Sequence, residues 1–242
     1  MPETVLVVDA ILFDMDGTLV DSTAGVEGAW HAFSKTYPGI DVKDILSSAH
    51  GVRTIDNLKN YCGIQDLELL EKEALRFEQE IVNTAAQNPN AGIVLLPGVS
   101  DAMKEAGFVF KRLGPRRHLP NPLWAICTSA TRAYASQALA VAGVPVPDVF
   151  VAAEDVKQGK PFPDPYLLGA EKCGVDPKNC VVFEDAPSGI RSGNAAGCKT
   201  IALLTTHSRE QVDAAQPDYV IQNMTQVSIR CLPEGVEIRI EA

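Results

Sequence analysis

The segment that most constrains this chain is residues 5–19, where an apolar run leads into two aspartates and a glycine. Residues 5–8 are apolar and mostly β-branched, which is typical of a buried strand in a parallel sheet. Gly17 ends the extended run, because a residue without a Cβ atom lets the chain turn sharply. We therefore expect Asp14 and Asp16 at the carboxyl end of a central strand, where open α/β sheets bind their ligands.

Asp14 and Asp16 are close enough in the sequence to share one bound cation. Two adjacent carboxylates repel one another unless a cation lies between them, and Mg²⁺ is a hard ion that prefers oxygen ligands of this kind. The other interpretation is an ordinary turn after a strand, since Asp and Gly are both common turn residues. Segments further along the chain favour the first interpretation.

Later segments place polar residues at the ends of further predicted strands and in one proline-rich turn. These segments are 126–129, ending in Thr128 and Ser129; 159–165, containing Lys160; and 181–185, ending in Glu184 and Asp185. With residues 14–18, their order resembles the haloacid dehalogenase superfamily, whose signature is a strand ending in Asp-x-Asp-Gly-Thr. Ordered matches spread over about 170 residues are far more specific than any single match.

The chemistry of phosphoryl transfer assigns a role to each of these residues. The reaction needs a nucleophile, neutralisation of the phosphoryl charge and a proton for the departing alcohol. Asp14 is the candidate nucleophile, which would form an aspartyl phosphate, and Asp16 is the candidate general acid and base. Thr128 and Lys160 are the candidates for contacts to the phosphoryl oxygens. The Mg²⁺ ligands that the resemblance implies are Asp14, Asp16 through its backbone carbonyl, Glu184 and Asp185, and the predicted substrate-binding residues near the motifs are Gly17, Thr18 and Ser129.

Several of these residues also have a purely structural interpretation. Glu184 and Asp185 could cap the helix that follows them, and Ser129 could cap a helix that begins near Thr131. Lysines are usually solvated, so the predicted role of Lys160 depends on its place between two proline-restricted turns. The presence of a second acid pair on a neighbouring strand favours metal binding for Glu184 and Asp185.

The order of predicted elements indicates a doubly wound α/β fold. The predicted strands are 124–128, 149–151, 179–183, 199–204 and 218–221, the predicted helices are 99–109, 131–142, 164–173 and 187–196, and residues 226–241 are predicted to form a terminal hairpin on an edge. Helical periodicity before residue 93 predicts helices at 24–37, 55–61 and 66–86. We therefore expect a parallel-sheet core of residues 1–19 and 94–242, with a small all-helical cap domain of residues 20–93 inserted after the first strand.

Substrate specificity is expected to come from the cap, because the core residues act only on the phosphoryl group. Residues 50–54 are the most distinctive segment of the cap. His50, Gly51 and Arg53 are its candidate substrate-binding residues, since an imidazole and a guanidinium flank a glycine that permits close approach. Arg53 could equally form an ion pair within the cap, and His50 could be an ordinary turn histidine.

Together with three core segments, residues 50–54 narrow the resemblance to one group of phosphatases. The core segments are 125–129, 155–161 and 182–190. The resemblance is to fungal-type glycerol-3-phosphate and 2-deoxyglucose-6-phosphate phosphatases, and it implies a small Mg²⁺-dependent enzyme that acts on linear polyol or sugar phosphates. Residues 110–122 depart from the pattern, being longer and more basic than expected before a strand, and a solvated loop is the expected structure.

Composition limits the classes of partner. The net charge of −10 argues against a nucleic-acid-binding surface, which needs clustered Lys and Arg. No apolar run is long enough to cross a membrane, and the first residues do not resemble a secretory signal. The six cysteines include no Cys-x-x-Cys pair, so reduced thiols and a cytoplasmic location are expected. We expect a monomer that binds a small phosphorylated substrate.

Two other functions fit the same motifs. A sugar phosphomutase of the same superfamily would keep Asp14 and Asp16 but exclude water after the first phosphoryl transfer. A non-catalytic module that binds a phosphorylated metabolite would use the same pocket without turnover. Release of inorganic phosphate, and its loss on the Asp14→Asn substitution, separates these alternatives from a phosphatase.

Overall fold

The computed structural model describes residues 4–46, 49–87, 92–105, 123–233 and 235–241. Its centre is a six-stranded sheet in which every neighbouring pair of strands is parallel, as expected for a doubly wound fold. In spatial order the strands are β6 (Val149–Val151), β5 (Trp124–Cys127), β2 (Ala10–Phe13), β7 (Cys180–Glu184), β8 (Lys199–Leu203) and β9 (Tyr219–Ile221). The chain moves outward from β2 in both directions, so the strand order reverses there. Such a reversal opens a crevice at the carboxyl ends of the strands.

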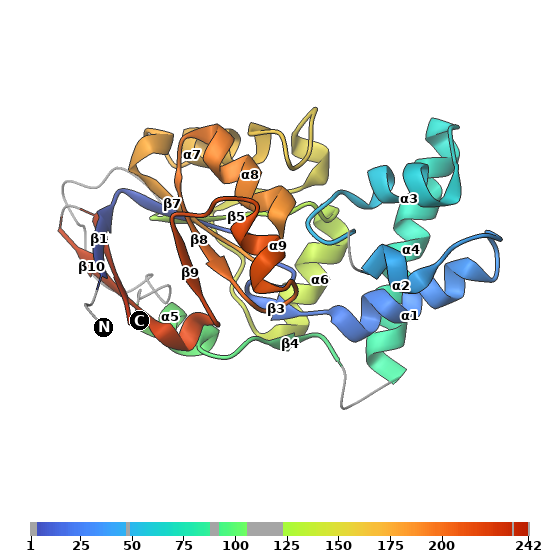
Figure 1. Cartoon of the computed structure of the whole chain (residues 1–242), viewed down its shortest axis with the longest axis horizontal. Helices are drawn as coiled ribbons and strands as arrows, with labels where there is room; N and C mark the ends of the chain where they lie inside the picture. The colour runs from blue at the N-terminus through green and yellow to red at the C-terminus, as the bar shows by residue number, and fades with distance from the viewer. Residues whose placement is uncertain (1–3, 47–48, 88–91, 106–122, 234, 242) are drawn as a thin grey trace.

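Helices cover both faces of this sheet (Figure 1). They are α5 (Val99–Glu105) and α6 (Arg132–Ala142) on one face, and α7 (Asp164–Lys172) and α8 (Pro187–Ala196) on the other, with the short α9 (Arg209–Asp213) after β8. Because side chains alternate along a strand, Ile11 and Phe13 pack with the first pair of helices, whereas Ala10 and Leu12 pack with the second. All four are buried, which explains why β2 is a continuous apolar run.

The predicted elements of the core lie close to their observed positions. The five predicted strands and the helices predicted at 131–142, 164–173 and 187–196 all agree with the structure to within one residue at each end. The helix predicted at 99–109 is α5, and its remainder lies outside the described residues. The basic residues Arg112, Arg116, Arg117 and His118 of the segment 110–122 also lie outside them.

The strand expected at residues 5–8 is present, but it lies outside the parallel sheet in which it was predicted. β1 (Thr4–Val8) pairs antiparallel with β11 (Gly235–Ile240), which in turn pairs with β10 (Val227–Leu232) in a separate three-stranded sheet. Val5 and Val7 are 45% and 56% exposed, because only one face of β1 is covered. The strand that leads to Asp14 is β2. The predicted terminal hairpin is confirmed, but it pairs with β1 instead of an edge of the parallel sheet.

A group of helices lies at one end of the molecule (Figure 1). In the order of the chain, these helices come after the short strand β3 (Val20–Asp21) and before the short strand β4 (Val94–Leu95). We call this group the helical unit: α1 (Thr23–Ser34), α2 (Val42–Leu46), α3 (Thr54–Cys62) and α4 (Leu67–Gln87). β3 and β4 pair with one another, so the chain enters and leaves the unit at one point. The domain boundaries predicted after residue 19 and before residue 94 lie beside this pair and remain a prediction.

Aromatic packing holds the helical unit together. The ring of Trp30 in α1 lies 4.6 Å from that of Phe77 in α4, and the Phe33 ring lies 5.0 Å from the Phe77 ring. The three helices expected from periodicity are α1, α3 and α4, whereas α2 was not predicted. It has five residues and buries only Ile45, so its sequence carries little periodic signal. No described helix is long and apolar enough to cross a membrane. The six cysteines all lie in the described residues, and no disulfide joins any two of them.

Candidate active site

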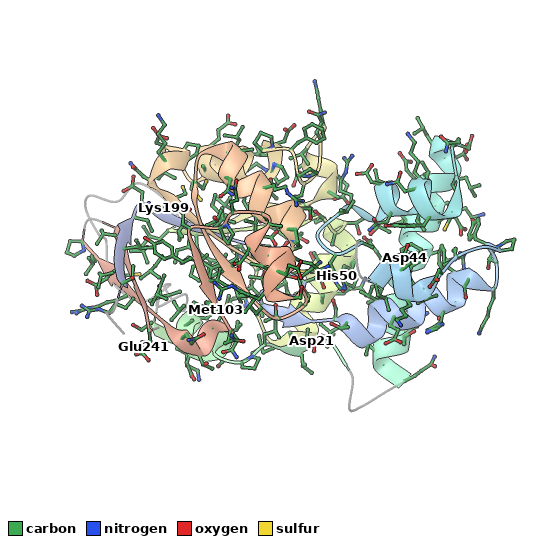
Figure 2. All side chains as sticks on the ribbon, viewed as in Figure 1. Asp21, Asp44, His50, Met103, Lys199 and Glu241 are labelled. Atoms are coloured by element: carbon green, nitrogen blue, oxygen red, sulfur yellow. The ribbon has the colours of Figure 1, made fainter. Side chains whose placement is uncertain are left out.

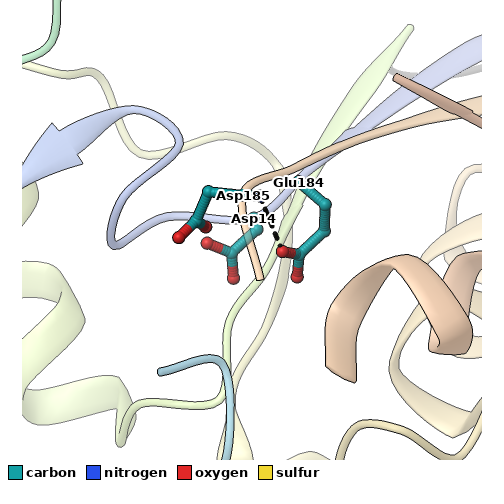
Figure 3. Close-up of side chains that lie close together, drawn as sticks. All are labelled: Asp14, Glu184 and Asp185. Carbon is teal, nitrogen blue, oxygen red and sulfur yellow. Dashed lines mark hydrogen bonds between the residues drawn. The ribbon is translucent and has the colours of Figure 1, made fainter. Parts of the chain in front are cut away.

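Parallel pairing of β2 and β7 brings the predicted acids together. Phe13 is in register with Phe183, so Asp14 and Glu184, the residues that follow each of them, lie side by side at the carboxyl edge of the sheet. Asp14, Glu184 and Asp185 each offer a carboxylate oxygen, and these oxygens all lie within 4.8 Å of one another. Figure 3 shows the three carboxyl groups converging. The meeting of acids from two strands, which the sequence predicted, is therefore observed.

Lys160 lies within this acid cluster. Its Nζ atom is 2.5 Å from Asp14 Oδ1 and 2.7 Å from Glu184 Oε1, and the residue is only 3% exposed. Burial alone would lower the pKa of Lys160, but the two carboxylates outweigh burial and raise it. Burial raises the pKa of Asp14 to about 7, against the opposing effect of Lys160. One ammonium group thus faces three buried carboxyl groups, so it cannot neutralise all three when they are ionised.

Glu184 is held by hydrogen bonds to both of its carboxylate oxygens. Oε1 accepts hydrogen bonds from Lys160 Nζ and, at 3.0 Å, from the Tyr166 hydroxyl. Oε2 accepts the backbone N–H groups of Asp185 and Ala186, each at 2.9 Å. A Cβ atom on Gly189 would lie 1.6 Å from Oε1, so only glycine fits here. Glu184 therefore fixes Lys160 and the turn into α8.

Asp185 does not cap the helix that follows it. The N-cap residue of α8 is Ala186, and no side chain caps it. Asp185 Oδ1 instead accepts a hydrogen bond from the Thr18 hydroxyl at 3.1 Å, and Oδ2 accepts one from the Thr206 hydroxyl. Burial raises the pKa of Asp185 well above its usual value, and Glu184 and Asp14 raise it further. This carboxyl is oriented by hydroxyl groups toward Asp14.

Gly17 and Thr18, predicted to bind substrate, lie against Asp185. Gly17 has a φ of +85°, and a Cβ atom there would be 2.3 Å from Asp185 Oδ2. Thr18 is fully buried. The sequence did not single out Thr205, whose hydroxyl donates to the Gly17 carbonyl, or Thr206. Both residues follow the predicted strand 199–204 and so lie at the same edge of the sheet as the acids. That position in the sequence could have identified them as candidate site residues.

Asp16 lies apart from the cluster and is held on one side. Its Oδ1 accepts hydrogen bonds from the Ser22 hydroxyl at 2.6 Å and from the Tyr134 hydroxyl at 3.0 Å. Burial raises the pKa of Asp16, and the two hydrogen bonds oppose that shift. Its carboxylate is not part of the group formed by Asp14, Glu184 and Asp185. Its predicted metal contact, through the backbone carbonyl, remains a prediction.

Thr128 and Ser129 take different positions after β5. Thr128 is 3% exposed, and its Oγ1 accepts the backbone N–H of Ala130 at 3.1 Å, which leaves the hydroxyl proton available to a ligand. The Ser129 hydroxyl donates to the Gly51 carbonyl at 2.9 Å. Capping of α6 by Ser129 was the alternative interpretation, but the N-cap is Thr131. Ser129 thus joins the core to the helical unit.

A cavity of about 90 Å³ lies between these residues and the helical unit. Its core side is formed by Asp14, Asp16, Thr128, Ser129, Ala130 and Tyr134, and its opposite side by Val26, Trp30, Leu46, Ala49, His50, Gly51, Val52, Thr54, Asn57, Phe77, Glu78 and Ile81. Glu78 was not predicted. It is 3% exposed and accepts hydrogen bonds from the Thr54 hydroxyl at 3.0 Å and from the Thr131 backbone N–H at 3.1 Å. In the sequence it is one of many acids on a long helix.

The loop before α3 carries the three predicted specificity residues. Figure 2 shows His50 at the junction of the helical unit and the core. Its ring packs edge-on against His207 with centroids 5.8 Å apart, and burial lowers the pKa of His50 to about 4. Gly51 has a φ of +74°, and a Cβ atom on it would lie 2.6 Å from the Ala186 Cβ. Arg53 forms an ion pair with Asp56 at 2.7 Å, which is the second of the two roles expected for it, and it does not line the cavity.

Comparison with known proteins places this site in a family. A family model described as haloacid dehalogenase-like hydrolase matches residues 8–197. The chain belongs to the haloacid dehalogenase-like hydrolase family. The matched residues run from Val8, the last residue of β1, through α8, and they include Asp14, Lys160 and Asp185. The family resemblance inferred from the motifs is confirmed.

Relatives of this hydrolase match it over most of its length. Hexitol phosphatase A of Escherichia coli is 36% identical over 93% of this chain and 95% of its own length. Glycerol-1-phosphate phosphohydrolase 1 of Saccharomyces cerevisiae is 32% identical over 93% of this chain and 86% of its own length. Among solved structures, beta-phosphoglucomutase of Clostridium difficile has a TM-score of 0.71 at 20% identity, covering 90% of this chain and 92% of that one. The last comparison supports the fold alone.

The residues at the acid cluster of this hydrolase suit a magnesium ion. Mg²⁺ prefers oxygen ligands and usually takes one or two carboxylates, with the remaining positions held by water and phosphate oxygens. Asp14 and Asp185 offer such oxygens, and both have a pKa raised by burial among like charges, which a bound cation would reverse. The oxygens of Glu184 already accept hydrogen bonds from Lys160 and the backbone. Asp14 and Asp185 are therefore better suited to direct contact with the ion.

Proposed function

We propose that this hydrolase is a Mg²⁺-dependent phosphomonoesterase that acts on a small polyol or sugar phosphate. The observation that carries the proposal is the position of Asp14, which lies at the end of the central strand between Lys160 and Asp185 and faces the cavity. A nucleophile in this position has a cation on one side and a metal site on the other, so that phosphoryl charge is neutralised where it is transferred. The relatives named as hexitol and glycerol phosphatases support the choice of substrate class.

The reaction divides into two displacements at phosphorus. In the first, an Asp14 carboxylate oxygen forms a bond to phosphorus as the bond to the substrate alcohol breaks, and Asp16 gives the departing oxygen a proton. In the second, Asp16 takes a proton from water, whose oxygen attacks phosphorus and releases Asp14 and inorganic phosphate. Lys160 and the Thr128 hydroxyl hold the phosphoryl oxygens. Asp14, Asp185 and the Asp16 carbonyl would hold a Mg²⁺ ion, which would neutralise further negative charge when bound.

The lining of the cavity favours an uncharged alcohol part. Its side toward the helical unit combines apolar groups such as Trp30 and Phe77 with the polar groups of His50, Asn57 and Glu78. Among the described residues that line it there is no lysine or arginine. Hydroxyl groups can bind to such a surface, whereas a second phosphate would be placed near the buried Glu78 carboxyl without a cation to pair with.

The same lining argues against a phosphomutase. A mutase that passes its phosphoryl group through Asp14 must bind a doubly phosphorylated sugar, with its second phosphate in the part of the cavity remote from Asp14. The cavity offers such a phosphate the Glu78 carboxyl and, among its described lining residues, no lysine or arginine to pair with it. A non-catalytic binding module is also disfavoured, because Asp14, Asp16 and Lys160 supply every group that turnover needs.

The test is phosphate release from a panel of glycerol, pentitol, hexitol and hexose phosphates, with Mg²⁺ and with EDTA. We expect release from one or more polyol or sugar monophosphates only with Mg²⁺, and none from the Asp14→Asn protein. The Asp213→Asn protein is a matched control, because that carboxylate is 50% exposed and pairs with Arg209 away from the site. Isomerisation of a hexose phosphate without phosphate release would establish the mutase instead. Ligand binding without turnover in the wild-type protein would establish the binding module.

A further inference from the structure

The two oxygens of the Asp16 carboxyl group have different surroundings. Oδ1 accepts both the Ser22 hydroxyl, at 2.6 Å, and the Tyr134 hydroxyl, at 3.0 Å. In the part of the chain that the structure describes, neither of these donors is bonded to Oδ2. Asp16 lines the cavity and is not fully buried, so the second oxygen is the one available to a ligand. Both hydrogen bonds that hold the Asp16 carboxyl group are therefore made to Oδ1.

Tyr134 is rigidly placed by the helix that carries it. It lies in the first turn of α6 and is 4% exposed. The N-cap residue Thr131 accepts the Tyr134 backbone N–H at 3.3 Å, and Thr131 is itself bonded to Glu78 of α4 through its backbone N–H and its hydroxyl. The beginning of α6 is therefore fixed by both the core and the helical unit. A phenol on this turn has little freedom to move away from Asp16.

Two hydrogen bonds to one carboxyl oxygen determine where a proton resides. A proton on Oδ1 would face two donor hydrogens, so the proton of a neutral Asp16 is favoured on Oδ2. General acid catalysis requires that proton to point at the oxygen that leaves phosphorus. We propose that Tyr134 is a positioning residue, which with Ser22 holds Asp16 by Oδ1 so that Oδ2 delivers the proton to the departing alcohol. This inference rests on the proposed function and adds residues outside the predicted site.

The proton balance is simple and suggests a selective test. When the bond between phosphorus and the alcohol oxygen breaks, the electron pair stays on that oxygen and the Asp16 Oδ2 proton neutralises it. An alcohol needs this proton, because an alkoxide is a poor leaving group. Acetate, the leaving group of acetyl phosphate, is stable as an anion and needs none. Since kcat/KM reports only the steps through departure of the leaving group, comparing the two esters isolates proton delivery.

The experiment measures kcat/KM of the Tyr134→Phe protein on the polyol phosphate that the wild-type protein hydrolyses best and on acetyl phosphate, both with Mg²⁺. We expect a loss of about 10- to 100-fold on the polyol phosphate, part of the usual contribution of general acid catalysis. On acetyl phosphate we expect a change of less than about threefold. Tyr37→Phe is the matched control, since its hydroxyl donates to Glu73 within the helical unit at 3.0 Å. It should leave both values unchanged.

Equal losses on the two esters, or no loss on either, would overturn the proposal, because the first indicates a general structural effect and the second no effect at all. The Ser22→Ala protein gives a second reading and decides the question if Tyr134→Phe does not fold. It removes the other donor to Oδ1 and should show the same selective loss. Failure of the proposed function has a different signature: the wild-type protein would then hydrolyse neither ester, which would overturn both proposals.

Discussion

At the scale of single residues, Lys160 is held on two sides by buried carboxylates. Its ammonium group lies between Asp14 and Glu184, and all three groups are nearly free of solvent. Breaking a buried ion pair by removing one partner leaves an uncompensated charge, which is far more costly than losing an exposed pair. Lys160 therefore has two roles in this structure, holding Asp14 in place and reducing the repulsion among the acids.

We predict that Lys160→Met lowers kcat for the polyol phosphate by about 100-fold or more, because the phosphoryl group loses its neighbouring cation. Steady-state assays with saturating Mg²⁺ measure the effect. Lys157→Met removes an exposed lysine from the same loop and should retain wild-type kcat. A Lys160→Met protein with near-normal kcat would show that Lys160 serves stability alone.

His50 gives a prediction about pH. Burial lowers its pKa from 6.5 to about 4, so between these values the unfolded chain binds a proton that the folded protein does not. The stability that this residue contributes is nearly complete above pH 6.5 and decreases as the pH falls toward 4, by about 2 kcal/mol at pH 5. The Tm of the wild-type protein should fall more between pH 7 and pH 5 than that of His50→Gln. Equal decreases would contradict a buried, neutral His50.

The sequence predicted some residues of the site and not others. Asp14, Lys160 and Asp185 follow strands or lie in a proline-rich turn, and those positions carry local signals. Tyr134 looks like any aromatic residue on the buried side of a helix, and Glu78 looks like any acid on a charged one. Their contacts join residues 118 and 53 positions apart in the chain, so only the tertiary fold brings them to the site.

At the scale of elements, the loop before α3 is one of the contacts between the helical unit and the core, besides the hydrogen bonds of Glu78 to Thr131. The Gly51 carbonyl accepts the Ser129 hydroxyl, and the His50 carbonyl accepts the Ser188 hydroxyl at 3.3 Å. There is no space between Gly51 and the first turn of α8. Residues 50–52 of this loop and Asp14 line the same cavity, so the fit of the loop on α8 should affect catalysis more than folding.

We predict different outcomes for alanine at two glycines of the helical unit. Gly51 and Gly63 have similar φ angles, +74° and +68°, but a Cβ atom on Gly63 meets nothing within 4 Å. Gly63→Ala should cost about 1 kcal/mol of stability through backbone strain, with kcat/KM unchanged. Gly51→Ala carries the same strain and also pushes the loop away from Ala186, so kcat/KM should fall. Equal effects of the two substitutions on kcat/KM would contradict this role of the loop.

The strands buried on both faces were predicted well, whereas β1, which is covered on one face, was assigned to the wrong sheet. β2 and β7 are continuous apolar runs between two layers of helices, and such runs are recognisable. β1 is also an apolar run, yet Val5 and Val7 face solvent, so its sequence does not distinguish the two situations. The pairing of β1 with β11, more than 200 positions away, has no local signal.

At the scale of the whole molecule, the acid cluster is a concentrated part of a net charge of −10. Three carboxyls buried around one lysine destabilise the metal-free fold, and a divalent ion that binds only the folded state stabilises it. The reversal of strand order at β2 explains why the cluster forms at this edge of the sheet, where the chain opens a crevice.

We predict that Mg²⁺ raises the Tm of the wild-type protein, with about 2.7 kcal/mol of stabilisation when its concentration is 100 times Kd. Asp185→Asn should lose most of this increase, because it removes a carboxylate from the cluster. Asp213→Asn should retain it. Thermal unfolding with and without Mg²⁺ measures the effect, and an equal increase for all three proteins would exclude the cluster as the metal site.

The most direct test of the central proposal is covalent capture of phosphate on Asp14. The protein is mixed with ³²P-labelled substrate and Mg²⁺, quenched in acid within one turnover, digested, and its labelled peptide is sequenced. We predict label on Asp14 in the wild-type protein and none in Asp14→Asn, which should also release no phosphate. Continued phosphate release by Asp14→Asn, or label on any other residue, would show that Asp14 is not the nucleophile.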